Sequence, residues 1–363
     1  RSRGYSDKPR IIKNPTTASL KRGTGGRSSF NGIVCTIFGA NGFIGRYLCN
    51  RLGKIGTQLI LPHRCDRYDI LPLKLCGDLG QVLFHPWDLR DDESIINCIR
   101  YSNVVVNLVG KEYETSNYDM YDVHVEGARR LARLAKQCNV ERFVHLSCLN
   151  APMLLEKGST ILKTKWLGEC AVREEFPEAT IVRPSVVYGQ EDKFITHYMH
   201  PFRRSLKQIP LWEKGEKTEK QPVHISDVAA GIAAIVTNPR TAGKTYQFVG
   251  PKRYQLAELI RWFFKLAAHG DEGVGYVIGH IKYNPMFQLK VSFNETIYGM
   301  YPAHHHSDKV VPGVPTLEDL GIVPIEMESQ MPWEIKPFAF YNFYLEKLGE
   351  MTTPPPPKTV PLQ

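Results

Sequence analysis

The sequence predicts an α/β protein with a doubly wound parallel sheet and a smaller C-terminal α/β region. Short apolar runs, typical of strands that are buried on both faces, alternate with amphipathic helical patterns over residues 33–187. A glycine-rich turn joins the first of these strands to the first helix. One of these helices is predicted over residues 125–138. Beyond residue 190 the alternation is lost, and an amphipathic helix is predicted over residues 256–268. A chain of 363 residues is long enough for about two domains.

The turn after the first strand carries the strongest functional signal. The strand over residues 33–38 is followed directly by Gly39, Ala40, Asn41, Gly42, Phe43, Ile44 and Gly45. Glycines at this spacing let the chain turn tightly, let the backbone approach a pyrophosphate and let the next helix pack on the strand. The helix N-terminus adds free N–H groups and the positive end of the helix dipole. The turn therefore predicts a Rossmann-type dinucleotide site, with a purely structural turn as the alternative.

The end of the second predicted strand, residues 58–61, bears on which nucleotide binds. An NAD site places an acidic residue about twenty residues beyond the glycines, where it binds the ribose 2′-hydroxyl. Arg64 lies near that position, and its guanidinium can make a forked contact with a 2′-phosphate. This favours NADP(H) over NAD(H). The alternative is a solvated charge cluster in which Asp66 makes the NAD-type contact.

Further motifs follow in an order that resembles the extended or atypical short-chain dehydrogenases/reductases, over residues 32–250. The resemblance implies adenine contacts after the third strand, a cofactor-lining turn after the fourth, a catalytic serine after the fifth and nicotinamide contacts after the sixth. The residues in these places are Asp88 and Leu89, then Asn107, Val109 and Gly110, then Ser147, and then Pro184 and Ser185. A late segment over residues 223–229 matches the start of a helix in the same family.

The catalytic pair of this family is incomplete in the sequence. The family uses Tyr-x-x-x-Lys on one helix, so that the ammonium group lowers the pKa of the phenol and also binds the ribose. Counting back from Lys165 puts Ile161 in the tyrosine position, and no tyrosine lies between Ser147 and Lys165. Ser147 alone would orient a carbonyl group, and Lys165 alone would hold ribose hydroxyls. We therefore predict a nucleotide-binding protein that lacks its general acid and is not an enzyme by itself.

The distribution of charge argues against a nucleic-acid-binding protein. The net charge is +9, but residues 1–31 contribute eight basic residues against one aspartate, or +7, which leaves +2 for the rest of the chain. A nearly neutral body provides no basic groove for a phosphate backbone. The basic segment is compatible with a mitochondrial-type targeting segment, a solvated tail or an arm that lies over a partner.

The cysteines, the histidines and the apolar runs argue against a disulfide-linked, a metal-binding and a membrane-spanning protein. None of the eight cysteines forms a C-x-x-C motif, which favours free thiols in a reducing compartment. Three adjacent histidines at residues 304–306 cannot all converge on one ion, so we predict no metal site. No apolar run approaches the ~20 residues that a membrane-spanning helix needs.

The domain prediction divides the chain into four parts. Residues 1–31 form a basic extended arm, and residues 32–250 form the NADP-binding domain, with parts of a second domain from about residue 190. Residues 251–345 form a smaller C-terminal region, and residues 346–363 form a Pro-rich extended tail. An exposed loop or hairpin is expected at residues 212–217. The aromatic residues crowded into 331–345 either pack on the domain or serve as an anchor for a protein partner or a membrane surface.

Nearly the whole chain resembles accessory subunits of mitochondrial respiratory complex I, the NADH:ubiquinone oxidoreductase, that have this dehydrogenase fold. The segments GRSSFNGIVCTIFGANGFIGRYL, HRCDRYDI, GDLGQVLF and AVREEFPEATIVRPS carry the resemblance. It implies a tightly bound structural NADPH and a peripheral place on the matrix side of the inner membrane, close to the quinone site. Core and accessory subunits of the complex would be the partners, with peripheral lipid contact and with no nucleic acid or metal.

One departure from that resemblance is Ile161, because such subunits can keep a tyrosine at this position. Two alternatives stay open. A soluble NADP-dependent reductase or epimerase would need another proton donor, such as His124 or His197. A redox-sensing module that responds to NADPH would use the same site with a moving element.

Overall fold

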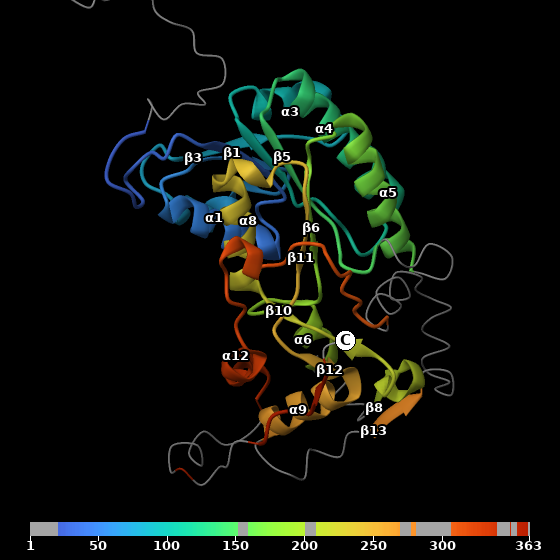
Figure 1. Cartoon of the computed structure of the whole chain (residues 1–363). Coiled ribbons are helices and arrows are strands. Elements are labelled where there is room, and N and C mark those ends of the chain that lie inside the picture. Colours follow the sequence, from blue (N-terminus) through green and yellow to red (C-terminus); the bar gives the residue numbers. More distant parts are fainter. Residues whose placement is uncertain are drawn as a thin grey trace, which may run out of the picture.

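A seven-stranded sheet forms the centre of the protein, for which Figure 1 shows a computed structural model. The structure describes residues 21–151, 159–199, 208–268, 277–280, 306–339, 349 and 354–361. The strand order is β11-β6-β5-β4-β1-β2-β3, and all neighbouring pairs are parallel. The strands are β1 (Val34–Phe38), β2 (Gln58–His63), β3 (Val82–Pro86), β4 (Val104–Asn107), β5 (Arg142–Leu146), β6 (Thr180–Pro184) and β11 (Thr245–Phe248). This order confirms the predicted doubly wound sheet, in which the strand order reverses between β1 and β4.

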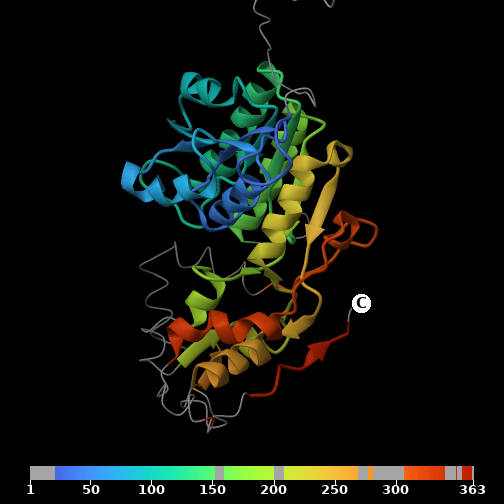
Figure 2. The same ribbon diagram turned by 90° about the vertical axis from the view of Figure 1, so that its left-hand side faces the viewer.

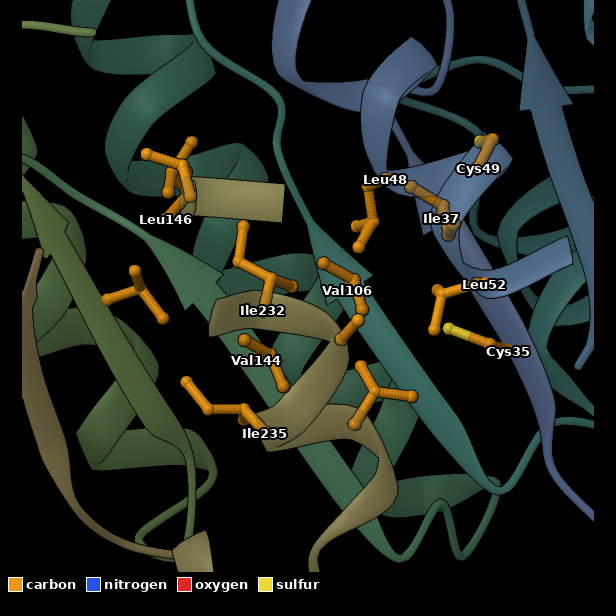
Figure 3. Packing of buried hydrophobic residues seen from close by; sticks show 14 of the residues in the cluster. Cys35, Ile37, Leu48, Cys49, Leu52, Val106, Val144, Leu146, Ile232 and Ile235 are labelled. Atoms are coloured by element: carbon orange, nitrogen blue, oxygen red, sulfur yellow. The ribbon is translucent and has the colours of Figure 1, made fainter. Parts of the chain in front are cut away.

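Helices cover both faces of the sheet, as Figure 1 shows. The main ones are α1 (Phe43–Lys54), α3 (Asp92–Ile99), α4 (Gly127–Gln137), α5 (Thr160–Glu175) and α8 (Ile225–Thr237). Successive side chains of a strand point to opposite faces, so Ile37 packs with residues of α1 and α8 whereas Phe38 packs with α3, α4 and α5. Figure 3 shows the first of these two cores, in which Leu48 and Ile232 meet the sheet.

Three elements differ from the expectation. The seventh strand, β11, comes from beyond residue 190, where the sequence pattern no longer indicated sheet. The helix predicted at residues 125–138 begins three residues earlier, with a π-helical turn η3 (Asp122–Glu126) before α4. The predicted loop at 212–217 contains a 3-10 turn, η5 (Trp212–Gly215), in which Glu213 and Lys214 have positive φ angles.

A second region with its own core lies below the sheet in Figures 1 and 2. Its elements are β7 (Val187–Tyr188), α6 (Phe194–Met199), β8 (Gln208–Leu211), β9 (Glu219–Lys220), β10 (Val223–His224), β12 (Arg253–Gln255), α9 (Leu256–Ala268), β13 (Val277–His280), α12 (Met327–Glu334) and β14 (Thr359–Val360). The predicted amphipathic helix is confirmed as α9, whose apolar face fills this core together with α6 and α12. The remaining short helices are α2 (Arg67–Ile70), η2 (Leu71–Cys76), η6 (Pro239–Thr241), η8 (Glu318–Leu320) and η9 (Lys336–Phe338).

The two ends of the chain are described in part. Arg22 and Phe30 pair through their backbones, while residues 1–20 of the basic arm lie outside the described residues. The Pro-rich tail contributes a strand, β14, which pairs antiparallel with β12. Of the crowded aromatics, Trp333 is 65% exposed and Phe338 packs partly against the second core. The other four, Phe340, Tyr341, Phe343 and Tyr344, lie outside the described residues.

Other sequence expectations concern thiols, metals and membranes. The eight cysteines are free thiols, and Cys170 among them is exposed. Within the described ranges, no three His, Cys, Asp or Glu side chains gather as metal ligands would. None of the described helices is both long enough and apolar enough to cross a membrane.

Candidate nucleotide-binding site

A cavity of about 430 Å³ lies where β1, β4, β5 and β6 end. Parallel sheets of this type bind ligands in the crevice at the carboxyl ends of the strands, where the strand order reverses. The predicted site residues in its wall are Gly39, Gly42, Phe43, Ile44, Gly45, Gly110, Ser147, Lys165, Pro184 and Ser185. The other predicted site residues are not in this wall; they are Asn41, Arg64, Asp88, Leu89, Asn107 and Val109.

The glycine turn leaves space for a ligand at the start of α1. Gly39 has a φ of +84°, and a Cβ there would lie 3.1 Å from the Leu108 carbonyl group. A Cβ on Gly45 would clash with the Gly39 oxygen, so this glycine lets the helix pack on the turn. Gly42 caps α1 without a side-chain hydrogen bond, and a Cβ there would meet only the Gly39 oxygen, at 3.2 Å. The first N–H groups of α1 have no partner within the helix, so they suit an anionic ligand.

Helix α5 brings Lys165 to the cavity. The helix begins at Ser159, whose hydroxyl accepts a hydrogen bond from the Ile161 N–H. A buried ion pair fixes it to β6, because the Arg183 guanidinium donates to both oxygens of Glu169 at 2.7–3.2 Å. The Lys165 ammonium lies 3.5 Å from the Leu146 carbonyl oxygen, and burial lowers its pKa.

Among the described residues, the wall next to Lys165 contains a hydroxyl but no phenol. A Cβ on Gly110 would approach the Lys165 ammonium to 2.8 Å, so this glycine makes room for the lysine. The Ser147 hydroxyl is buried and has no hydrogen-bond partner in the described part of the chain. Ile161, one helical turn before Lys165, lines the same wall with an apolar side chain. The cavity therefore offers an ammonium and a hydroxyl to a ligand, and Ile161 supplies no proton.

His124, the alternative proton donor of the sequence analysis, is held neutral. Its Nε2 accepts the Lys111 N–H at 3.1 Å, and its Nδ1 lies 2.8 Å from the Thr164 hydroxyl. That hydroxyl already donates to backbone carbonyls, so Nδ1 carries the proton and donates it to Thr164. Burial, followed by the charge of Lys165, lowers the pKa of His124 to about 2. This geometry does not favour His124 as a proton donor, and neither His124 nor His197 is in the cavity wall.

Asn107 and Leu89 lie outside the cavity wall and support the elements next to it. The Asn107 carboxamide oxygen accepts the Val109 N–H at 3.0 Å, and its nitrogen lies 3.2 Å from His145. This arrangement fixes the turn that follows β4. The Leu89 side chain packs where a Cβ on Gly127 would come within 2.9 Å of it, so Leu89 sits against the start of α4. Asn41 reaches the end of β2, where its nitrogen lies 3.5 Å from the Cys65 sulfur.

Arg64 and Asp88 meet at one tyrosine, Tyr118. The Arg64 guanidinium carbon lies 5.5 Å from the centre of the Tyr118 ring, and the Tyr118 hydroxyl donates to the Asp88 carboxylate at 3.1 Å. The backbone N–H of Arg90 also donates to Asp88, and these contacts lower the pKa of Asp88. The sequence did not place Tyr118; the structure puts it at the predicted adenine end. Tyr188 is buried in the second core.

The far end of the cavity carries a buried ion pair that the sequence did not reveal. The Lys220 ammonium lies 3.2 Å from Asp308, and both side chains are almost fully buried. Asn150 and the Gln221 N–H also donate to Asp308. Asn150, the adjacent pair Lys220 and Gln221, and Asp308 come from three separate parts of the chain, and no local motif connects them. Lys193 and Glu112 form a second, more exposed pair in the same wall.

Comparisons with known proteins agree with this geometry. Residues 35–153 match the NAD dependent epimerase/dehydratase family, and residues 159–272 match the RmlD substrate binding domain. A solved structure of DesIV, a dTDP-glucose 4,6-dehydratase from Streptomyces venezuelae with NAD and TYD bound, superposes with a TM-score of 0.63 at 17% identity. The superposition covers 88% of this chain and 99% of the DesIV chain. The fold and the cavity thus define a Rossmann-type protein of the epimerase/dehydratase fold.

Two curated relatives extend over most of the chain. The NADH dehydrogenase (ubiquinone) 1 alpha subcomplex subunit 9, mitochondrial, of Rattus norvegicus is 40% identical over 94% of this chain and 89% of its own length. The NADH-ubiquinone oxidoreductase 40 kDa subunit, mitochondrial, of Neurospora crassa is 35% identical over 86% of this chain and 82% of its own length. The chain belongs to this family of mitochondrial NADH dehydrogenase subunits.

Proposed function

We propose that this protein is a non-catalytic accessory subunit of mitochondrial complex I that binds NADP(H) as a structural ligand. The observation that carries the proposal is the wall around Lys165, which keeps the groups that bind a nucleotide and has Ile161 in place of the phenol. The family to which the chain belongs is named for subunits of NADH dehydrogenase. A reductase would need another acid, and His124 is held neutral with both ring nitrogens engaged.

The chain's own residues account for binding of the nucleotide along the cavity. The N–H groups at the start of α1 would hold the pyrophosphate, with Gly42 leaving the space above them. Lys165 would bind ribose hydroxyls, and Pro184 and Ser185 would lie beside the nicotinamide. A bound nicotinamide nucleotide supplies hydride chemistry in other proteins of this fold, whereas here the apolar Ile161 favours binding without turnover.

Arg64 is the group that would select NADP(H) over NAD(H). Its guanidinium is exposed and makes no hydrogen bond or ion pair with the residues that the structure describes, so its donors are available to a 2′-phosphate. Asp66, the residue that would make the NAD-type contact, is exposed at the start of α2. The position of the Arg64 guanidinium at the end of β2, with its donors available, therefore supports binding of NADP(H) rather than NAD(H).

The nucleotide would act by stabilising the folded subunit where it joins the complex. A ligand that binds only the folded state stabilises it by about 4 kcal/mol at a thousandfold excess over Kd, a large share of a typical stability of about 5–15 kcal/mol. We place the subunit on the matrix side of the inner membrane, at the junction of the peripheral and membrane arms near the quinone site. Core and accessory subunits would surround it, and its surface would contact lipid only peripherally.

Assembly of the complex in mitochondria tests this function. Arg64→Glu places a negative charge where the 2′-phosphate would bind, and we expect less of the subunit and less assembled complex on native gels. Arg67→Glu is the matched control, because Arg67 is an exposed arginine on the neighbouring α2. Normal assembly of the Arg64→Glu variant would contradict the structural-ligand role. Migration of the native chain as a free monomer or small homo-oligomer would contradict its role as a complex I subunit.

A further inference from the structure

The ring of Tyr118 is shared by two guanidinium groups. The guanidinium carbon of Arg90 lies 4.4 Å from the centre of the ring, and that of Arg64 lies 5.5 Å from it. Cations at these distances from an aromatic face are attracted by its quadrupole. Tyr118 belongs neither to the glycine turn nor to the end of β2, so the tertiary structure alone brings it beside Arg64.

The two arginines differ in what else they contact. Arg90 donates to the Asn117 carbonyl oxygen at 2.7 Å and lies 3.5 Å from the Asp122 carboxylate, so its guanidinium is tied to the chain around Tyr118. Arg64 has the ring as its contact and no hydrogen-bond acceptor among the described residues. An arginine carries five N–H donors in a fixed plane. Contact with the ring therefore limits where the Arg64 guanidinium lies without occupying its donors.

The hydroxyl of Tyr118 ties the same ring to Asp88. The hydroxyl donates to the Asp88 carboxylate at 3.1 Å, and the backbone N–H of Arg90 donates to the same carboxylate at 2.9 Å. Asp88 is the predicted adenine contact, whereas Arg64 is the predicted contact for the phosphate on the adjoining ribose. One side chain thus sets the distance between the group that would bind the base and the group that would bind the 2′-phosphate.

We infer that Tyr118 is the positioning residue that sets the preference of this site for a nucleotide with a 2′-phosphate, because its ring holds Arg64 in place. The inference rests on the proposed binding of NADP(H) and adds a residue to it. Tyr118 makes two separable contributions. Its ring acts on Arg64 and thus on the 2′-phosphate alone, whereas its hydroxyl acts on Asp88 and thus on the adenosine that NADPH and NADH share.

A double-mutant cycle on the full-length chain tests the ring. Calorimetry gives the Kd for NADPH and for NADH in the unaltered protein, in Tyr118→Leu, in Arg64→Ala and in the double variant. We expect Tyr118→Leu to weaken NADPH about fivefold more than NADH, the size of a cation–π contact of about 1 kcal/mol. On the Arg64→Ala background it should leave the ratio of the two Kd values unchanged, since the ring then has no arginine to position.

Two further variants separate the ring from the hydroxyl and from general effects. Tyr118→Phe keeps the ring and should weaken both nucleotides equally. Tyr113→Leu is the control, because Tyr113 packs with Lys111 and not with Arg64, and both Kd values should stay unchanged. Equal weakening of both nucleotides by Tyr118→Leu, or additive effects in the cycle, would overturn the inference. Failure of the unaltered protein to bind NADPH would instead overturn the proposed function.

Discussion

The candidate site has two parts that differ in the groups they offer a ligand: a glycine end beside α1, and a lysine end around Ser147 and Lys165. At the glycine end, the turn, the start of α1 and the Arg64–Tyr118–Asp88 group offer backbone donors, space and a guanidinium to a dinucleotide. At the lysine end, Ser147 and Lys165 line the cavity, and Ile161 lies one helical turn before Lys165. His124 is not in the cavity wall, and both of its ring nitrogens are engaged. Under the proposed function, this difference teaches that nucleotide binding and catalysis are separable, because they depend on different residues of one fold.

Gly42→Val should have the largest effect, because it acts on the glycine end itself. The backbone of Gly42, with φ of −73° and ψ of 170°, suits a valine, so we expect the fold to survive. The valine side chain would occupy the space above the α1 N-terminus and weaken NADPH roughly 1000-fold, or about 4 kcal/mol. Calorimetry together with circular dichroism measures both effects, and Gly42→Ala should lie between the two. Full binding by Gly42→Val would show that the nucleotide does not use this turn.

Ile161→Tyr tests whether the lysine end needs only a general acid to become catalytic. A phenol one turn before Lys165 should raise NADPH oxidation with a reactive test quinone about 100-fold over the unaltered protein, since general acids contribute 10²–10⁴. Ile161→Phe supplies the same bulk without the hydroxyl and should give no increase. If the tyrosine variant binds NADPH and still shows no turnover, this end lacks more than its acid.

Arg64→Ala tests whether Arg64 gives the glycine end its preference for NADPH over NADH. Losing hydrogen bonds between charged groups costs about 1.5–3 kcal/mol, so NADPH should bind roughly ten- to a hundredfold more weakly. NADH, which lacks the 2′-phosphate, should bind nearly as before. Equilibrium titration with both nucleotides measures the two changes, and equal losses would refute the assignment of Arg64.

The smallest expected effect is on the pH dependence of stability, through His145 near the lysine end. Burial, followed by the charge of Lys165, lowers its pKa to about 3, whereas an unfolded histidine titrates near 6.5. Below pH 6.5 the unfolded chain takes up a proton at this residue that the folded chain does not, so stability falls as the pH falls, by up to about 1.4 kcal/mol per pH unit. His145→Gln should remove this part of the slope in urea unfolding between pH 6.5 and 4.5. An unchanged slope would show that His145 does not contribute it.

Much of the fold could be predicted because its signals are local. The buried strand before Gly39, the glycine spacing and the order of the later motifs predicted the doubly wound sheet, which the structure confirms. Strand β11 was missed, since its four residues follow a long stretch without alternation and become part of the sheet only by pairing with β6. Helix α12 was missed for a similar reason, because its sequence has no apolar stripe and contains Pro332.

The sequence by itself determined the glycine turn, the isoleucine four residues before Lys165 and the cationic residue at the end of β2. These features depend on a residue's type and on its spacing from near neighbours, which a chain carries whether or not it is folded. Only the tertiary structure decided that Tyr118 joins Arg64 to Asp88 and that Lys220 is buried against Asp308. Such contacts join segments far apart in the chain, and folding the sheet and both cores brings them together.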